Sequence, residues 1–327
     1  MKKLLCGIAC VMAAAIVAAA QNTAVVDKHV AAARAAGGTE HAAMVDRLCP
    51  MPGAKPAAGR GGTGQGGGRR GGGPPAPPPR ESWYAEPAKV FDNLYFVGMT
   101  EFTAWAIPTS AGIIVIDPVF DYSVEASVVE GLKKLGFNPA DIRYVLVSHG
   151  HLDHAGGAKL LQERFGARVL MGEADWEMVE RQKPSWLPKR DMIVTDGQRL
   201  TLGDTTITMY LTPGHTDGTV STFIPVRDGN RRHLAFLWGG TAFNFGPDAK
   251  RFAAYAASAA RMRDLVTKLG ADVLLSNHTD FDGTKVKLPA LARRAPGAPH
   301  PYVVGTDSVR GYLTVAHECA QAALASL

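Results

Sequence analysis

The sequence is short of cysteine and, outside two segments, of positive charge, and both shortages exclude classes of protein. Four cysteines in 327 residues are too few for a disulfide-rich scaffold. Seven of the cations behind the formal net charge of +5 lie at Lys2–Lys3 and in the acid-free stretch 52–80, so the remaining sequence carries about −2. A basic nucleic-acid-binding surface is therefore not expected on the main part of the chain. With 46% hydrophobic residues the chain can fill a sizeable core, which excludes wholesale disorder.

The first twenty residues have the pattern of a secretory signal peptide. Lys2 and Lys3 precede an apolar run, Leu4–Val17, and three alanines form a small-residue cleavage site before Gln21. The run has fourteen residues, whereas a membrane-spanning helix needs roughly 20. An uncleaved anchor and a lipoprotein at Cys10 are the weaker alternatives. We expect residues 1–20 to be removed and the mature protein to be secreted to the periplasm without a stable membrane anchor.

Cys49 and Cys319 are the only cysteines left after that cleavage. In an oxidising compartment they can form one disulfide that ties the N-terminal segment to the C-terminal helix, or they can remain two free thiols. Both alternatives stay open, because the sequence does not contain the geometry on which a disulfide depends.

A Gly/Pro/Arg-rich stretch, residues 52–80, separates an N-terminal segment, residues 21–51, from the rest of the chain. Eleven of its residues are glycine and seven are proline, so it cannot bury a core. Its Gly-Arg pieces resemble RNA-binding tracts, but no aromatic residue is interleaved for base stacking. We expect a flexible linker, no nucleic-acid partner, and one domain over residues 81–327.

From Trp83 onward, apolar runs typical of strands alternate with amphipathic helical segments. Strands are predicted at 93–97, 103–108, 112–117, 143–148, 167–171, 206–211, 220–225, 233–238 and 272–276. Helices are predicted at 123–135, 155–165, 174–181, 252–269 and 308–327, and within 27–48. Two similar halves of this kind predict an α/β sandwich with its helices outside.

One predicted buried strand ends in a cluster of metal-binding side chains. The cluster is a His-x-His-x-Asp-His pattern formed by His149, His151, Asp153 and His154. Imidazole and carboxylate groups suit zinc, and one loop cannot surround a metal, so further ligands should lie at other strand ends. His215 and His278 each follow an apolar strand and enter a loop.

This pattern resembles the signature of the metallo-β-lactamase superfamily, and the resemblance extends from about Trp83 to Leu327. It implies an α/β fold of the αββα type, in which two mixed sheets are flanked by outer helices and a two-zinc site lies along one edge. It also implies which residues hold the two zinc ions of each chain. The first ion would have His149, His151 and His215, and the second Asp153, His154 and His278.

The subfamily depends on the residue between the two distant histidines. Glyoxalase II, lactonase and tRNA-processing members usually have a bridging aspartate there, and the first β-lactamase subclass has a cysteine. This chain has Gly240 and Thr241, neither of which can be an anionic ligand. A set of six ligands without a bridging residue is similar to that of subclass B3 metallo-β-lactamases. The segment Trp83–Pro87 also resembles the stretch that precedes the first strand in that subclass.

The resemblance therefore implies a secreted zinc-dependent β-lactamase that acts on small-molecule antibiotics and causes resistance. The expected mechanism is attack of a zinc-bound hydroxide on the lactam carbonyl, with Asp153 as the catalytic residue that orients it. Two alternatives stay open: another hydrolase of this fold acting on a lactone, thioester or phosphoester, and a zinc-binding protein without turnover. The sequence does not decide the substrate, the native metal or the oligomeric state.

Other candidate residues have weaker sequence support. Asp117, at the end of a strand, is either a hydrogen-bond partner of a ligand histidine or an ordinary turn aspartate. Thr241 and Asn244 are the obvious polar groups for a substrate carboxylate, and Thr241 is equally explained as a packed or turn residue. Five more histidines have no partner pattern and are assigned no role: His29, His41, His233, His300 and His317.

Overall fold

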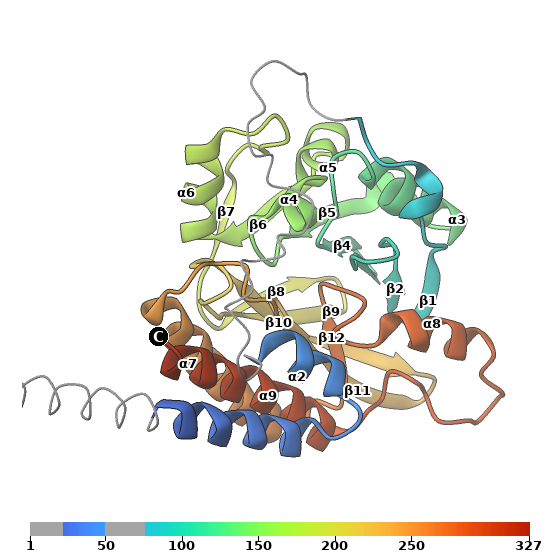
Figure 1. The fold of residues 1–327 in the computed structure, drawn as a ribbon. Coiled ribbons are helices and arrows are strands. Elements are labelled where there is room, and N and C mark those ends of the chain that lie inside the picture. The colour runs from blue at the N-terminus through green and yellow to red at the C-terminus, as the bar shows by residue number, and fades with distance from the viewer. Residues whose placement is uncertain (1–21, 50–75) are drawn as a thin grey trace, which may run out of the picture.

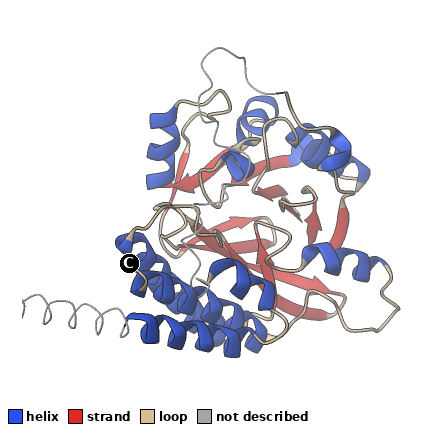
Figure 2. Cartoon of the chain, in the orientation of Figure 1, coloured by secondary structure: helices blue, strands red, loops and turns tan. Residues whose placement is uncertain are grey.

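The computed structural model describes residues 22–49 and 76–327. The expected signal peptide and residues 52–75 of the expected linker lie outside the described residues. The described chain forms two sheets packed face to face, with helices on their outer faces (Figures 1 and 2). Both sheets contain parallel and antiparallel pairs, which confirms the expected α/β sandwich of the αββα type.

The N-terminal half builds a seven-stranded sheet whose strands lie in chain order. Its strands are β1 (Ala88–Phe91), β2 (Leu94–Phe96), β3 (Trp105–Thr109), β4 (Gly112–Ile116), β5 (Ile142–Leu146), β6 (Arg168–Gly172) and β7 (Met192–Val194). From β4 to β7 the strands are parallel, so helices make the crossovers between them. These helices are η2 (Glu125–Val129) continued by α3 (Glu130–Lys134), then α4 (Leu152–Ala155), α5 (Ala158–Phe165) and α6 (Glu173–Gln182), with short 3₁₀ turns η1 (Arg80–Ser82) and η3 (Pro139–Asp141) nearby.

The C-terminal half builds a five-stranded sheet in the order β12-β11-β10-β9-β8. Its strands are β8 (Gln198–Leu202), β9 (Thr205–Leu211), β10 (Val220–Asp228), β11 (Arg231–Trp238) and β12 (Val273–Ser276). The long helices α7 (Ala249–Leu269) and α9 (Thr306–Ala325) pack together over its outer face, and α8 (Thr284–Ala292) lies beside β1.

The core has three layers that follow from this arrangement. One lies between the sheets, where residues such as Leu146 and Leu275 are buried. Another separates the first sheet from its helices, and the third separates the second sheet from α7 and α9. Strand β4, in the middle of the first sheet, and β12, at one end of the second, are therefore buried on both faces. Strand β9, which lies next to the outer strand β8, alternates buried and half-buried residues.

Two helices of the N-terminal segment, residues 22–37 and α2 (Ala42–Leu48), lie along α9 (blue beside red in Figure 1). Cys49 and Cys319 form a disulfide with an S–S distance of 2.07 Å. Of the two alternatives for these cysteines, the structure has the bonded one.

Several element boundaries differ from the sequence prediction. Of the predicted helix 155–165, Ala155 ends α4 and the rest begins at Ala158 as α5. Gly157, between them, packs so closely that a Cβ there would lie 2.2 Å from the Pro118 carbonyl oxygen. Strands β1, β7 and β8 and helix α8 were not predicted, since three to five residues of mixed polarity give a short strand little periodicity.

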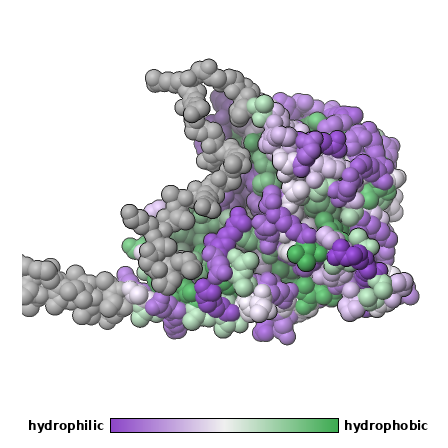
Figure 3. Space-filling model, turned by 45° about the vertical axis from the view of Figure 1, so that its right-hand side comes forward, coloured by the Kyte–Doolittle hydropathy of each residue, from purple (hydrophilic) through white to green (hydrophobic). Residues whose placement is uncertain are grey.

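No helix in the described part of the chain is long and apolar enough to cross a membrane. On the face drawn in Figure 3, hydrophilic residues cover most of the described surface and the hydrophobic ones form small, separate areas.

Candidate metal centre

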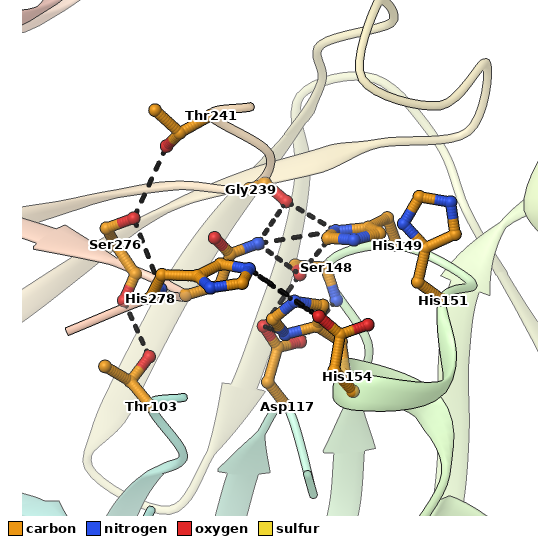
Figure 4. Close-up of polar contacts among 12 residues, drawn as sticks. Thr103, Asp117, Ser148, His149, His151, His154, Gly239, Thr241, Ser276 and His278 are labelled. Carbon is orange, nitrogen blue, oxygen red and sulfur yellow. Dashed lines mark hydrogen bonds and ion pairs between the residues drawn. The ribbon is translucent and has the colours of Figure 1, made fainter. Parts of the chain in front are cut away.

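All six predicted ligands lie where strands of the two sheets end. His149 and His151 belong to the loop after β5, which continues into α4 with Asp153 and His154. His215 comes from the loop between β9 and β10, and His278 follows β12. Figure 4 shows the β5–α4 side chains and His278 entering from opposite sides.

Three imidazoles converge at one point of this edge. His215 Nε2 lies 3.1 Å from His149 Nε2 and 3.1 Å from His151 Nδ1. Burial, together with the neighbouring imidazoles, holds the pKa values of His149 and His215 well below the usual range. Both rings are therefore neutral at pH 7, which is the form that binds a metal.

The other three predicted ligands form a second group beside the first. Asp153 Oδ2 lies 3.2 Å from His154 Nε2 and 3.6 Å from His278 Nε2, and the two Nε2 atoms are 3.3 Å apart. Burial opposes ionisation of Asp153, but His154 and His278 outweigh it and hold the pKa of this carboxyl below its usual range. The group therefore supplies one carboxylate and two imidazoles.

Hydrogen bonds on the far side of the rings fix which nitrogen faces the cluster. His149 Nδ1 donates to the Gly239 carbonyl at 2.7 Å, and His215 Nδ1 donates to the Ala242 carbonyl at 2.6 Å. Each bond holds the proton on Nδ1 and leaves the Nε2 lone pair free for a metal.

Asp117 orients the third ring, that of His154. Its Oδ2 lies 3.2 Å from His154 Nδ1, and its carboxylate accepts hydrogen bonds from the backbone N–H and the hydroxyl of Ser148, both at 2.7 Å. Burial alone would lower the pKa of His154, but Asp153 and Asp117 on either side raise it to about 10. Asp117 therefore contacts His154, one of the predicted ligands, as the first of its two readings expects.

These residues fit a zinc centre. Within the described chain, two groups offer ligand atoms that all lie within 4.8 Å of one another: one is His149, His151 and His215, and the other is His149, Asp153 and His154. Five imidazoles and one carboxylate are a donor set that zinc accepts, and the histidines His149, His154 and His215 each have a polar partner for the second ring nitrogen, as metal-binding histidines do.

Comparison with known proteins gives the family. The family model described as the metallo-beta-lactamase superfamily matches residues 103–229, which include five of the six converging ligands. The fold and the site geometry agree with that match. Residues 103–229 match the metallo-β-lactamase superfamily, and the chain has the fold of that superfamily.

Solved structures of this superfamily share the fold over most of their length. A subclass B3 metallo-β-lactamase of Bradyrhizobium japonicum is 29% identical with a TM-score of 0.60, covering 69% of this chain and 89% of that one. A native metallo-β-lactamase from Legionella gormanii is 25% identical with a TM-score of 0.61, covering 69% and 91%.

The curated proteins that are similar in sequence are named hydroxyacylglutathione hydrolases rather than β-lactamases. A hydroxyacylglutathione hydrolase of Acidiphilium cryptum is 29% identical over 204 residues, 60% of this chain and 78% of that protein. One of Mesorhizobium japonicum is 35% identical over 120 residues, 35% of this chain. This chain spans 43% of the length of the latter relative, less than half.

The two predicted substrate contacts, Thr241 and Asn244, lie in different surroundings. Thr241 is 1% exposed, and its hydroxyl is 2.8 Å from the hydroxyl of Tyr312. This geometry fits the reading of Thr241 as a packed threonine and does not present its hydroxyl to a substrate. Asn244 lies in the exposed loop between β11 and α7, two residues after the carbonyl that holds His215.

The five histidines without an assigned role lie outside the six-ligand group. His29 pairs with Glu318, His233 with Asp272, and His41, His300 and His317 each bond a backbone carbonyl.

Three supporting residues escaped the sequence analysis. Ser148 and Asn277 adjoin ligands, and Asn277 Nδ2 donates to the same Gly239 carbonyl as His149, at 2.7 Å. Their positions next to His149 and His278 were a signal. Asp175 is buried behind the site and lies far from the ligands in sequence, so no local pattern marks it.

Proposed function

We propose that this metallo-β-lactamase-superfamily hydrolase is a secreted, two-zinc β-lactamase of the subclass B3 kind. The observation that carries the proposal is the make-up of the second ligand group. His154 faces Asp153 and His278, so that group is complete without a bridging acid.

The place of the family's bridging residue also lacks an anionic ligand. A Cβ on Gly240 would lie 2.5 Å from Cβ of His215, so no side chain fits there without movement. The next residue, Thr241, turns its hydroxyl to Tyr312. This arrangement favours the β-lactamase reading over a glyoxalase II reading, whose usual members have an aspartate at this position.

The chain's own residues divide the catalytic work. Zinc, when bound, lowers the pKa of a coordinated water to about 7 and polarises a carbonyl oxygen. Asp153, ionised and beside both groups, accepts a hydrogen bond from the attacking water and so orients it toward the carbonyl carbon. Asp117, through His154, keeps the second group in position. Asn244, in the exposed loop, is a hydrogen-bond donor for the substrate carboxylate.

Thioester hydrolysis is the second candidate, because the sequence relatives are named hydroxyacylglutathione hydrolases. The mature chain would be assayed with nitrocefin, a carbapenem and S-lactoylglutathione, with added zinc and with chelator, alongside metal counting. We expect chelator-sensitive lactam turnover with about two zinc ions per chain. Thioester turnover without lactam turnover would overturn the β-lactamase proposal, and a metal-loaded chain inactive on both would overturn both proposals.

Secretion is tested separately. In a Gram-negative host we expect the full chain in the periplasmic fraction, with Gln21 as its first residue. An uncleaved chain that remains with the membranes would contradict this.

A further inference from the structure

A buried carboxylate behind the metal centre binds the backbone of both loops that carry the first three ligands. Asp175, in the first turn of α6, is 1% exposed. Its Oδ2 accepts a hydrogen bond from the backbone N–H of Gly150 at 2.7 Å and another from the hydroxyl of Thr216 at 2.7 Å. Its Oδ1 accepts from the backbone N–H of Gly218 at 2.9 Å.

Two of the three donors lie immediately beside predicted ligands. Gly150 separates His149 from His151, and Thr216 follows His215 directly. One carboxylate therefore joins the loop after β5 to the loop between β9 and β10, and these loops belong to different sheets.

The β9–β10 loop and the start of α6 are closely packed around Asp175. A Cβ on Gly172 would lie 2.1 Å from the carbonyl oxygen of Gly218, and a Cβ on Gly218 would lie 2.8 Å from Oδ1 of Asp175. The β9–β10 loop therefore packs directly against the start of α6.

The carboxylate is chemically required at this point. Burial raises the pKa of Asp175, and the bonds from Thr216, Gly150 and Gly218 act against that shift by stabilising the ionised form. An amide has one acceptor oxygen and an NH₂ group, so asparagine would turn a donor toward at least one of these three donors. A buried N–H left without an acceptor costs about 1–3 kcal/mol.

We propose that Asp175 is a positioning residue for the first metal group: by bonding both loops it sets the spacing of His149, His151 and His215. Asp175 itself does not face the metal. The proposal concerns metal binding and holds whichever substrate the enzyme takes.

The test compares Asp175→Asn with Asp272→Asn in the full chain. Asp272 also accepts a backbone N–H, from Leu234 at 3.1 Å, but lies at the opposite end of β12 from His278. Zinc dissociation constants would be measured by competition with a chromophoric chelator, and the cobalt(II)-substituted proteins by their visible absorption. For Asp175→Asn we expect 10–100-fold weaker binding of the first ion, as is usual for partners of metal ligands, and an altered cobalt spectrum.

A change confined to stability would overturn the proposal. Asp175→Asn could lower the melting temperature of the zinc-free chain but leave the zinc dissociation constant and the cobalt spectrum as in Asp272→Asn. Asp175 would then stabilise the fold without positioning the metal ligands. If Asp175→Asn does not fold, Thr216→Val removes one of the three donors and keeps the rest. We expect it to weaken zinc binding by a smaller factor, and an unchanged constant would overturn the proposal equally.

Discussion

At the scale of single residues, the site depends on which atom of each ligand faces the cluster. The carbonyls of Gly239 and Ala242 keep the protons of His149 and His215 on Nδ1. Asp117 contacts Nδ1 of His154, on the side of the ring away from the cluster. In each of these contacts the two partners are far apart in the sequence. Removing one ligand side chain therefore leaves the contacts that orient the other ligands in place.

Asp153→Ala removes the one carboxylate of the six ligands. We expect zinc content to fall from about two ions to about one per chain, with at least a 100-fold loss of hydrolysis, because the second group keeps only two imidazoles and no carboxylate. Metal counting after dialysis measures this. The control is His233→Ala, whose imidazole pairs with Asp272 at 2.6 Å outside the cluster. Equal losses in both variants would mean that the ligand assignment is wrong.

The raised pKa of the buried Asp282 predicts that the free energy of unfolding depends on pH. Burial raises its pKa from 3.8 to about 6, although Lys287 and the backbone N–H groups of Ser276 and Thr284 lower it in part. Between pH 4 and 6 the unfolded chain loses this proton while the folded chain keeps it, so the ionisation costs stability as the pH rises through this window.

Asp282→Asn removes that cost. Relative to wild type, we expect the variant's free energy of unfolding to increase by about 3 kcal/mol from pH 4 to pH 7, since each pKa unit corresponds to about 1.4 kcal/mol. Urea unfolding of both zinc-free proteins at each pH unit measures the difference. A difference that stays constant with pH would show that the pKa of Asp282 is not raised.

At the scale of elements, the sequence predicted what local patterns encode. Long apolar runs such as those of β4 and β10 were found, and the His149–His154 spacing located the site because one short segment carries four ligands. Short strands such as β7 were missed. The two readings of Thr241 stayed open because Tyr312, which bonds its hydroxyl, lies 71 residues away, and Asp175 was missed for the same kind of reason.

The disulfide between Cys49 and Cys319 fastens the N-terminal helices to α9. The bonded residues are 270 positions apart, so the bond closes most of the chain into a loop and limits the unfolded state. His29 of the first helix contacts Glu318 of α9, and His41, in the turn just before α2, contacts Ser308 of α9.

Replacing both cysteines by serine should lower the free energy of unfolding by about 2–4 kcal/mol. Denaturant unfolding of wild type with and without reductant, and of the double variant, measures it. Reductant should weaken wild type to the level of the variant and leave the variant unchanged. If reductant has no effect on wild type although both thiols become available for alkylation, the bond does not stabilise the fold.

At the scale of the whole molecule, the six ligands join the two sheets at one edge. Four ligands follow β5 of the first sheet, whereas His215 and His278 come from the second. This placement follows from a fold in which the ends of strands from both sheets meet. Periodicity predicted only an α/β sandwich, and the resemblance carried by the His149–His154 motif implied this particular fold.

Because both sheets supply predicted ligands, zinc should stabilise the folded chain as a unit. Ligand that binds only the folded state adds about 4 kcal/mol at a concentration 1,000 times its dissociation constant. For a domain of this size that amounts to a rise in melting temperature on the order of 10 °C, measured by calorimetry with zinc and with chelator. His233→Ala should show the full rise, and Asp153→Ala a smaller one, since its first group still binds. If wild type and Asp153→Ala respond equally to chelator, the second group does not hold a metal that links the sheets.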